Sequence, residues 1–469
     1  MRVVAVIAVL LGLGVASAAA APVPKAPAPV FVLTGGGWGH GVGMSQWGAY
    51  GQANAGRDYR QILATYYRGT DMGSAPDTLL KRVRVLVGDS LATVAVTNVA
   101  AVFDGAGKRY PIAGGSITAG PDLKLPVGKN GKPLALAGPV TIRAAKDAFL
   151  SYAGKEFRGD LRVANISGRV QLVNVVGLEA YLLGVVPGEM PKDWPLAALE
   201  AQAVAARTYA VANVVRGRPF DLYSDSRSQV YYGVGSEAPG PSQAVRETGG
   251  QILTYDGAPA ETFYFSSSGG RTISALDAFG LDLPYLVAVD DPWDTASPNH
   301  AWPAQLVTAA QLAARFGLGD PVADAAYVPG TPGKPAVMRL TTAAGRTTDQ
   351  RLSDVRSRLG LKSTGFRLGV LRLDVPTLQK GQDSTVRLTG VARDVTGAVL
   401  ERRMPAGTWA TVKRLPASDD GAFAVTVRPT STTTYRLSAD GKRPKKGAEG
   451  HAATRTVSGG PARPSAESR

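Results

Sequence analysis

The chain has 469 residues, of which 44% are apolar and 19% charged, and its formal net charge is +15. This composition can bury a core and argues against wholesale disorder, and at roughly 150 residues per domain the length suggests two to four globular units. Because the sequence contains no cysteine, disulfides, thiolate nucleophiles and cysteine-ligated metal sites are excluded. The positive charge favours an anionic partner, either nucleic acid, anionic lipid or a cell-wall polymer.

The N-terminal segment predicts export. Residues 1–21 combine an early arginine, an apolar run and small residues at the end, which is the pattern of a signal peptide. The apolar run is too short for a stable membrane span, although an uncut anchor is the alternative. A Pro/Ala linker follows at 22–30, and no later stretch is apolar enough to cross a bilayer. We therefore expect a secreted or cell-wall protein, with no membrane span after signal cleavage and no nucleic-acid partner.

The next elements alternate between glycine-rich, strand-like and helical patterns. A Gly-rich segment at 35–51 leads into an amphipathic stretch at 59–67. Short alternating runs separated by Gly, Asn and Asp predict strands from 81 to about 185. A strong helix is expected over 195–215, with Pro195 at its first position and alanines along one face.

The second half of the sequence contains three further regions with different residue patterns. Residues 229–290 are β-rich and 301–365 mix helical and strand patterns. From 369 to 440 short alternating strands are typical of a small, immunoglobulin-like β-sandwich, and the basic, aromatic-free tail at 441–469 predicts disorder. The expected fold class is therefore α+β: a β-rich main domain with a central Ala-rich helix at 31–368, followed by an all-β sandwich domain.

The Gly-rich segment carries candidate site residues. It contains neither G-x-G-x-x-G nor a Walker A spacing, so a phosphate-binding loop is rejected. His40 within it is either structural or part of a site. Trp38, Trp47 and Tyr50 either belong to the core, which is the simpler interpretation, or stack on sugar rings.

The loop VVPGEMPKDWP contains a candidate general acid, Glu189. A carboxyl group among apolar neighbours in a rigid loop has a raised pKa and can stay protonated near neutrality. Desolvation must then outweigh the N-terminus of the following helix, which favours the ionised form. The alternative is a surface glutamate in a turn.

Polar residues on and after the helix suggest ligand contacts or ordinary structure. Glu200 and Arg207 lie two helical turns apart, so a structural ion pair is plausible, and Glu179 is expected to be structural. The segments DSRSQVYYG and YFSSSGGRT cluster hydroxyls, amides and glycines that suit a polyhydroxylated ligand but also suit hairpins. Ser267 and Ser268 have no G-x-S-x-G context and no evident histidine partner, so a serine hydrolase is rejected.

Together these segments resemble the SpoIID/LytB family of stage II sporulation protein D and amidase enhancers. The resemblance covers roughly residues 31–368 and includes GWGHGVGMSQWGAYG, VVPGEMPKDWPLAALEAQAVAARTYA, LPYLVAVDDPWD and LGLKSTGFRL. It implies an exported peptidoglycan lytic transglycosylase that cleaves the MurNAc–GlcNAc bond of denuded glycan strands and leaves 1,6-anhydro-MurNAc ends. The resemblance assigns the catalytic acid to Glu189 of the E-M-P motif and a functional arginine to Arg207.

Two departures from the family pattern stand out. GHGVGMSQWGA, usually at the end of the domain, here lies at 39–49, so the resemblance implies a circular permutation in which residues 31–70 complete the domain. Some relatives bind zinc through two histidines and a cysteine near the SGG turn. Residues 263–275 contain neither residue type, so we expect no metal and no cofactor.

The chemistry of a single carboxyl group agrees with this resemblance. A hydrolytic glycosidase uses two carboxylates, whereas a lytic transglycosylase can use one, because the C6 hydroxyl of the sugar is the nucleophile. The rival hypothesis is a non-catalytic wall-binding enhancer of an N-acetylmuramoyl-L-alanine amidase. The expected partners are glycan strands and a cell-wall amidase, and the predicted substrate-binding residues are His40, Ser45, Gln46, Gln202, Arg207, Asp225, Gln229, Tyr231, Ser267, Ser268 and Gly269.

Overall fold

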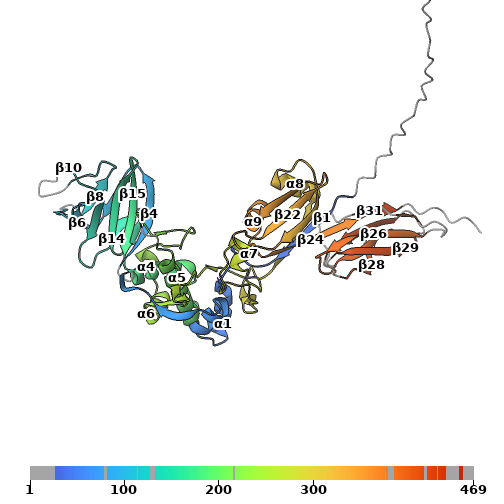
Figure 1. The fold of residues 1–469 in the computed structure, drawn as a ribbon, viewed down its shortest axis with the longest axis horizontal. Helices are drawn as coiled ribbons and strands as arrows, with labels where there is room; N and C mark the ends of the chain where they lie inside the picture. The colour runs from blue at the N-terminus through green and yellow to red at the C-terminus, as the bar shows by residue number, and fades with distance from the viewer. Residues whose placement is uncertain are drawn as a thin grey trace, which may run out of the picture. The chain divides into compact units, whose positions relative to one another are not determined.

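The structure, a computed structural model, is coloured by residue number in Figure 1. It describes residues 27–78, 82–112, 115–126, 133–214, 217–374, 377–378, 385–416, 420–429, 431, 433–439 and 454–457. The predicted signal peptide and the first residues of the predicted linker lie outside this part of the chain. Two compact units are present, one formed by Val32–Gln305 with Ala310–Leu368 and the other built mainly from Gly369 onward.

A seven-stranded sheet dominates the first half of the larger unit (Figure 1). Its strands run in the order β16-β4-β15-β14-β11-β6-β7, and all neighbours are antiparallel except β16 and β4. A second sheet, β13-β12-β5-β8, and the hairpin β9-β10 accompany it. The strands are β4 (Val83–Leu91), β5 (Val94–Thr97), β6 (Val99–Phe103), β7 (Arg109–Pro111), β8 (Ser116–Ala119), β9 (Lys124–Pro126), β10 (Pro133–Ala135), β11 (Val140–Ala144), β12 (Leu150–Tyr152), β13 (Lys155–Phe157), β14 (Asp160–Ile166), β15 (Arg169–Val176) and β16 (Leu222–Tyr223).

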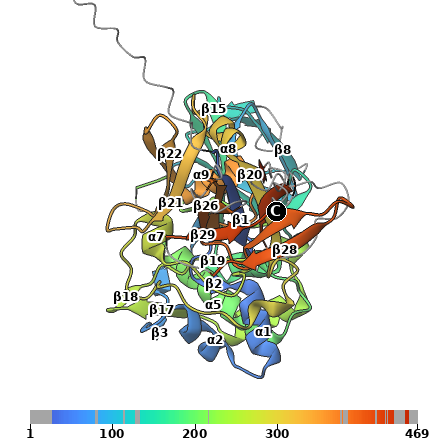
Figure 2. The same ribbon diagram turned by 90° about the vertical axis from the view of Figure 1, so that its right-hand side faces the viewer.

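Helix α5 (Leu196–Ala212) is the centre of the helical part and confirms the predicted Ala-rich helix, although Pro195 is its N-cap instead of its first residue and the helix ends at Ala212 instead of 215. Its alanines are buried on several sides, because side chains this small let neighbouring helices approach closely. Helices α1 (Gln46–Asn54) and α2 (Tyr59–Tyr66) lie beside α5 (Figure 2). The other neighbours are α4 (Leu178–Glu189) and α6 (Pro239–Glu247).

Short strands tie the N-terminal segment to distant parts of the larger unit. Strand β2 (Met44–Ser45) pairs in parallel with β19 (Tyr264–Phe265), and β3 (Asp71–Ser74) pairs with β17 (Gln251–Tyr255). Ser363 donates a hydrogen bond to the carbonyl of Gly36 at 2.6 Å. The remaining elements of this part of the chain are β1 (Val30–Gly35), β18 (Ala258–Pro259), α7 (Ala275–Phe279), β20 (Trp302–Thr308), α8 (Ala309–Phe316), β21 (Val322–Val328), β22 (Val337–Thr342), β23 (Thr347–Arg351) and α9 (Leu352–Leu359).

The second unit is all β. Strand β26 (Val386–Arg393) pairs with β24 (Phe366–Leu373), β25 (Thr377–Leu378) and β29 (Ala422–Val427). The other sheet runs β28-β27-β30-β31, with β27 (Val399–Arg403), β28 (Trp409–Arg414), β30 (Thr433–Ser438) and β31 (Thr454–Val457). Alternate residues of β26 are buried, as one-sided packing requires.

One strand corrects the prediction of disorder for 441–469. Residues Thr454–Val457 form β31, which pairs antiparallel with β30. Two threonines and a valine in four residues favour extended backbone, so this short run completes a sheet edge. The other residues of the predicted tail lie outside the described part of the chain.

The fold class agrees with the α+β, β-rich expectation, since α1, α2, α4 and α6 pack against α5 and the other described elements include several sheets. Within the described residues, we find no helix that combines the length and the apolar character needed to cross a bilayer.

Candidate active site

Glu189 is the last residue of helix α4, not a loop residue as the sequence predicts. The helix forms because Leu178, Tyr181, Leu182 and Val185 recur at helical spacing and are buried. Its final turn, which includes a proline, ends at an extended Met190. A helix C-terminus presents partial negative charge, so the position itself disfavours an ionised Glu189.

The Glu189 carboxyl group is held by neutral donors. The backbone N–H of Val230 donates to Oε1 at 2.9 Å, and the side chains of Tyr264 and Gln46 also donate hydrogen bonds to the carboxyl group. Burial raises the pKa of Glu189, and these three hydrogen bonds oppose the shift without cancelling it. Glu189 nevertheless keeps part of its surface exposed, so a ligand can reach it.

A network of buried amides and phenols supports these donors. Gln229 Nε2 donates to the hydroxyl of Tyr264 at 3.0 Å, and Tyr181 donates to Gln229 Oε1 at 3.2 Å. Burial raises the pKa of Tyr264 well above its usual value, so its phenol stays protonated and can donate. Gln46 Nε2 donates to Gln202 Oε1 at 3.4 Å, which leaves Gln202 Nε2 as a buried donor without a partner among the described residues.

Aromatic side chains cluster around the two segments that carry Gln46 and Glu189. Trp47, directly after Gln46, packs edge-on against Trp194 with ring centroids 4.9 Å apart. Tyr50 lies 4.9 Å from the same ring. All three rings are partly exposed, as sugar-stacking platforms must be. Trp38 is 47% exposed and contacts Lys362 rather than this cluster.

His40 supports the site indirectly. Val42 N–H donates to its Nδ1 at 3.1 Å, so Nε2 carries the proton and donates to the carbonyl of Tyr264 at 3.1 Å. Burial lowers the pKa of His40 to about 4, which keeps the imidazole neutral at pH 7. The ring therefore anchors the backbone of Tyr264, whose hydroxyl reaches Glu189.

The predicted hydroxyl residues face two buried aspartates instead of the Glu189 carboxyl group. Ser45 and Ser267 donate to Asp294 at 3.3 and 3.0 Å. Ser268 donates to Asp291 at 2.8 Å, and the N–H of Gly269 donates to Asp294 at 2.9 Å. These hydroxyl and N–H donors are used in hydrogen bonds inside the protein. The hydrogen bonds connect the N-terminal segment to the SGG turn. No role was predicted for either aspartate from the sequence.

Arg207 corrects two predictions. Its guanidinium is fully buried and forms a bidentate pair with Glu179 at 2.7 and 2.8 Å, so its partner is not Glu200. Its remaining donors reach Thr248 and backbone carbonyls, including that of Gln251 at 3.2 Å. With no exposed surface and its donors occupied, Arg207 clamps α4, α5 and α6 together and cannot contact a polymer.

Two further candidates also lie away from the carboxyl group. Tyr231 is 2% exposed, and its hydroxyl donates to Asn174 Oδ1 at 2.9 Å within the core. Asp225 pairs with Arg227, whose guanidinium lowers the pKa of the aspartate to about 2. Of the eleven predicted binding residues, Gln46 is the one that donates a hydrogen bond to Glu189 within the described part of the chain, while His40, Gln202 and Gln229 act through a neighbour.

Sequence reasoning missed the two tyrosines of the network. Tyr264 is the first residue of the quoted segment YFSSSGGRT, and Tyr181 follows Glu179 by two positions, but neither belongs to a recognisable catalytic spacing. Their role depends on contacts between distant segments. In the part of the chain that the structure describes, no three His, Cys, Asp or Glu side chains are grouped as metal ligands.

Residues 166–255, which contain Glu189, Arg207 and Gln229, match the family model described as stage II sporulation protein, SpoIID. Over this region the chain is similar to the SpoIID/LytB family.

Individual relatives share only part of their length with it. An uncharacterized protein of Brachyspira hyodysenteriae is 39% identical over 139 residues, which are 29% of this chain and 38% of that protein. Stage II sporulation protein D of Bacillus subtilis is 34% identical over 215 residues, 42% of this chain and 61% of that protein. The amidase enhancer of Bacillus subtilis is 37% identical over 121 residues, 26% of this chain and 16% of that protein. The chain thus spans less than two thirds of each of these relatives.

Proposed function

We propose that the protein is an exported peptidoglycan lytic transglycosylase that uses Glu189 as its general acid and base. The observation that carries this proposal is the environment of Glu189: a partly accessible carboxyl group whose pKa is raised by burial and which accepts hydrogen bonds from the neutral groups of Val230, Tyr264 and Gln46. The match of residues 166–255 to the SpoIID family model and the similarity to an amidase enhancer support a cell-wall role.

In the proposed reaction the carboxyl group of Glu189 acts first as an acid and then as a base. Protonated Glu189 donates its proton to the glycosidic oxygen as the bond from that oxygen to C1 of MurNAc breaks. The C6 hydroxyl oxygen of the same sugar attacks C1, and its proton passes to the Glu189 carboxylate. The products are a 1,6-anhydro-MurNAc end and a free GlcNAc hydroxyl, and Glu189 is protonated again.

The neighbours of Glu189 suit this sequence of proton transfers. Burial raises the pKa of the carboxyl group and so favours its protonated form before the first step, and the hydrogen bonds from Gln46, Tyr264 and Val230 stabilise the carboxylate formed afterwards. A hydrolytic glycosidase instead needs a second carboxylate roughly 5–10 Å away. The groups hydrogen-bonded to Glu189 are an amide, a phenol and a peptide N–H.

Mass spectrometry of purified, peptide-free glycan strands after incubation with the protein tests this proposal. Anhydro ends from the wild type, and none from Glu189→Gln, are the expected result. Reducing ends formed by uptake of water would show a hydrolase, and intact strands would contradict any glycan-cleaving activity.

The second candidate is a non-catalytic enhancer of an N-acetylmuramoyl-L-alanine amidase. The similarity to an amidase enhancer and the net charge of +15, which suits binding to an anionic wall, favour it. An enhancer needs no proton donor, so Glu189→Gln would keep full stimulation of the amidase. The same variant therefore separates the two candidates.

A further inference from the structure

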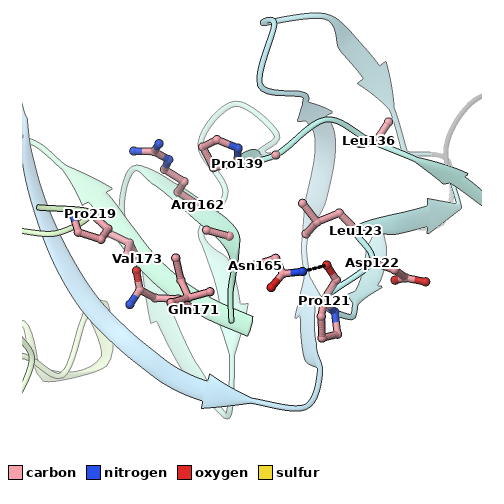
Figure 3. A pocket seen from close by; sticks show the side chains of 13 residues that line it. Pro121, Asp122, Leu123, Leu136, Pro139, Arg162, Asn165, Gln171, Val173 and Pro219 are labelled. Atoms are coloured by element: carbon pink, nitrogen blue, oxygen red, sulfur yellow. Dashed lines mark hydrogen bonds between the residues drawn. The ribbon is translucent and has the colours of Figure 1, made fainter. Parts of the chain in front are cut away.

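A pocket opens in the β-rich half of the larger unit, and none of the residues that line it contacts Glu189. Its volume is about 520 Å³, within the range of small-molecule sites. Strands β14 and β15 form one wall, and the segments around Leu123, Leu136 and Pro139 form the other (Figure 3). The site proposed above does not use this pocket.

Arg162 brings an uncompensated positive charge to the pocket. It lies on β14 and is partly buried, and no carboxylate is paired with it among the described residues. Arg84, two strands away in the same sheet, is already paired with Asp221. Burial and the charges of Arg82 and Arg84 lower the pKa of Arg162 from its ordinary value. The pocket is therefore a place where an anion would relieve repulsion between cations.

Gln171 brings a buried acceptor that has no partner. It lies on β15 and is 6% exposed, and its Nε2 donates to Asp89 Oδ1 at 3.3 Å. Because a carboxylate can only accept, the amide nitrogen must face Asp89, and this fixes the orientation of the amide. Gln171 Oε1 is then a buried acceptor without a hydrogen-bond partner among the described groups. A ligand that donates a hydrogen bond to it would remove the free-energy cost of leaving it unsatisfied.

The strand register places these two groups on one face. Arg162 is opposite Val173, and Ala164 is opposite Gln171, so Arg162 and Gln171 are diagonal neighbours across β14 and β15. Diagonal pairs lie roughly 7–8 Å apart at the backbone, within reach of one bound group. Apolar side chains complete the pocket: Leu123, Leu136, Pro139, Val173 and Pro219.

We propose that this pocket binds the carboxyl-terminal residue of a peptide. The free carboxylate would pair with the Arg162 guanidinium, the amide N–H of the same residue would donate to Gln171 Oε1, and a small aliphatic side chain would contact the apolar wall. An acylated amino acid carries this acceptor and this donor on adjacent atoms.

A phosphodiester fits less well. It offers no hydrogen-bond donor to Gln171 Oε1, and a repeating polyanion would meet Asp122 at the rim and Asp89 behind Gln171. A singly charged ligand with its own N–H satisfies both unpaired groups at once. This inference does not depend on cleavage chemistry at Glu189.

Isothermal titration calorimetry on the full chain tests it with N-acetyl-D-Ala-D-Ala and N-acetyl-L-Ala-L-Ala. The D form represents a wall stem-peptide end and the L form an ordinary protein end, so the two arms identify the source. We expect saturable binding of at least one. The C-terminal amide of that dipeptide, which lacks the charge, should bind at least about tenfold more weakly, as should the acid to Arg162→Gln.

Two controls keep the test specific. Arg109→Gln, an exposed arginine on β7 of the same sheet, should leave the affinity unchanged. Glu189→Gln should also bind the dipeptide normally, so failure of the proposed catalysis would be distinguishable from failure of this site. Ala164→Met narrows the pocket beside Gln171 and should weaken binding even if Arg162→Gln does not fold.

Several results would overturn the proposal. They are no saturable binding of either dipeptide, equal affinity for the acid and its amide, and unchanged affinity in a folded Arg162→Gln protein. Tighter binding of glycerol phosphate than of both dipeptides would assign the pocket to phosphate polymers instead.

Discussion

The side-chain amide of Gln46 donates a hydrogen bond to the carboxyl group of Glu189, and the whole 83–176 β region separates the two residues in sequence. Gln46 is the first residue of α1, and the hydroxyl of the N-cap residue Ser45 donates a hydrogen bond to the buried Asp294. The Gly-rich N-terminal segment is thus part of the environment that sets the pKa of Glu189. This contact gives a structural reason for residues 31–70 to complete the domain, as the permutation hypothesis requires.

Replacing Glu189 with glutamine should reduce strand cleavage by at least about 100-fold, the usual contribution of a general acid. Glutamine keeps an oxygen that can accept from the N–H of Val230, so glycan binding and the melting temperature should stay close to wild type. Anhydro-end formation by mass spectrometry and a thermal melt measure the two effects. Glu200→Gln on the next helix is the matched control, and wild-type turnover in Glu189→Gln would remove Glu189 from the mechanism.

Tyr264→Phe should shift the pH profile of cleavage. The Tyr264 hydroxyl donates to the Glu189 carboxyl group and favours its ionised form, so its removal raises the pKa of Glu189 further. The first step needs a protonated carboxyl group, and activity falls as the pH rises through that pKa. The alkaline limb of the kcat/KM profile should therefore move to higher pH. Tyr255→Phe on β17 should not move it, and a shift of Tyr264→Phe to lower pH would contradict the assigned hydrogen bond.

Local sequence patterns predicted the elements but not the partners they bring together. The spacing of apolar residues was enough to predict the Ala-rich helix, because the buried side chains recur at regular intervals within that one helix. The separation of two helical turns suggested Glu200 as the partner of Arg207, whereas the partner in the structure, Glu179, comes from α4. A helical periodicity reports only neighbours on its own helix. The bonds from Tyr264 and Gln46 to Glu189 likewise depend on tertiary packing, which no spacing in the sequence encodes.

Arg207→Met should destabilise the protein without changing the chemistry of the folded fraction. The substitution removes a fully buried partner of Glu179, whose side chain is 36% exposed and is therefore partly compensated by water. We expect a loss of about 2–4 kcal/mol in the free energy of unfolding, measured by urea denaturation. Glu200→Gln should change it by less than about 0.5 kcal/mol. A stable Arg207→Met protein with a raised KM would instead indicate direct contact with substrate.

Cleavage should be insensitive to EDTA. The chain has no cysteine and three histidines. Both ring nitrogens of His40 are hydrogen-bonded, and His300 Nδ1 lies 3.2 Å from Asp294. His451 lies outside the described residues. Activity measured before and after dialysis against EDTA should agree, and loss that zinc restores would point to His40 or His300 as ligands.

Removing the N-terminal segment should abolish folding or activity. A protein that begins at residue 78 loses α1, α2 and buried core residues, among them Val42, Met44 and Ile62. A segment of roughly 40 residues with many glycines is too small to sustain a core of its own, so we expect it to be part of the domain rather than a separate module. Cooperative unfolding and a full cleavage rate in the truncated protein would show that the permutation hypothesis is wrong.

A single substitution in α1 tests how the N-terminal segment packs against the rest of the domain. A Cβ added at Gly48 in α1 would meet the Tyr66 hydroxyl and the carboxylate of Asp291, which are both buried and hydrogen-bonded to each other. Gly48→Ala should therefore destabilise by about 1–3 kcal/mol, the usual effect of overpacking, although alanine is the better helix former. Because α1 carries Gln46, cleavage should fall as well. Asn54→Ala, exposed at the end of the same helix, should change neither quantity, and if Gly48→Ala were more stable than wild type, α1 would not be packed against Asp291 as described.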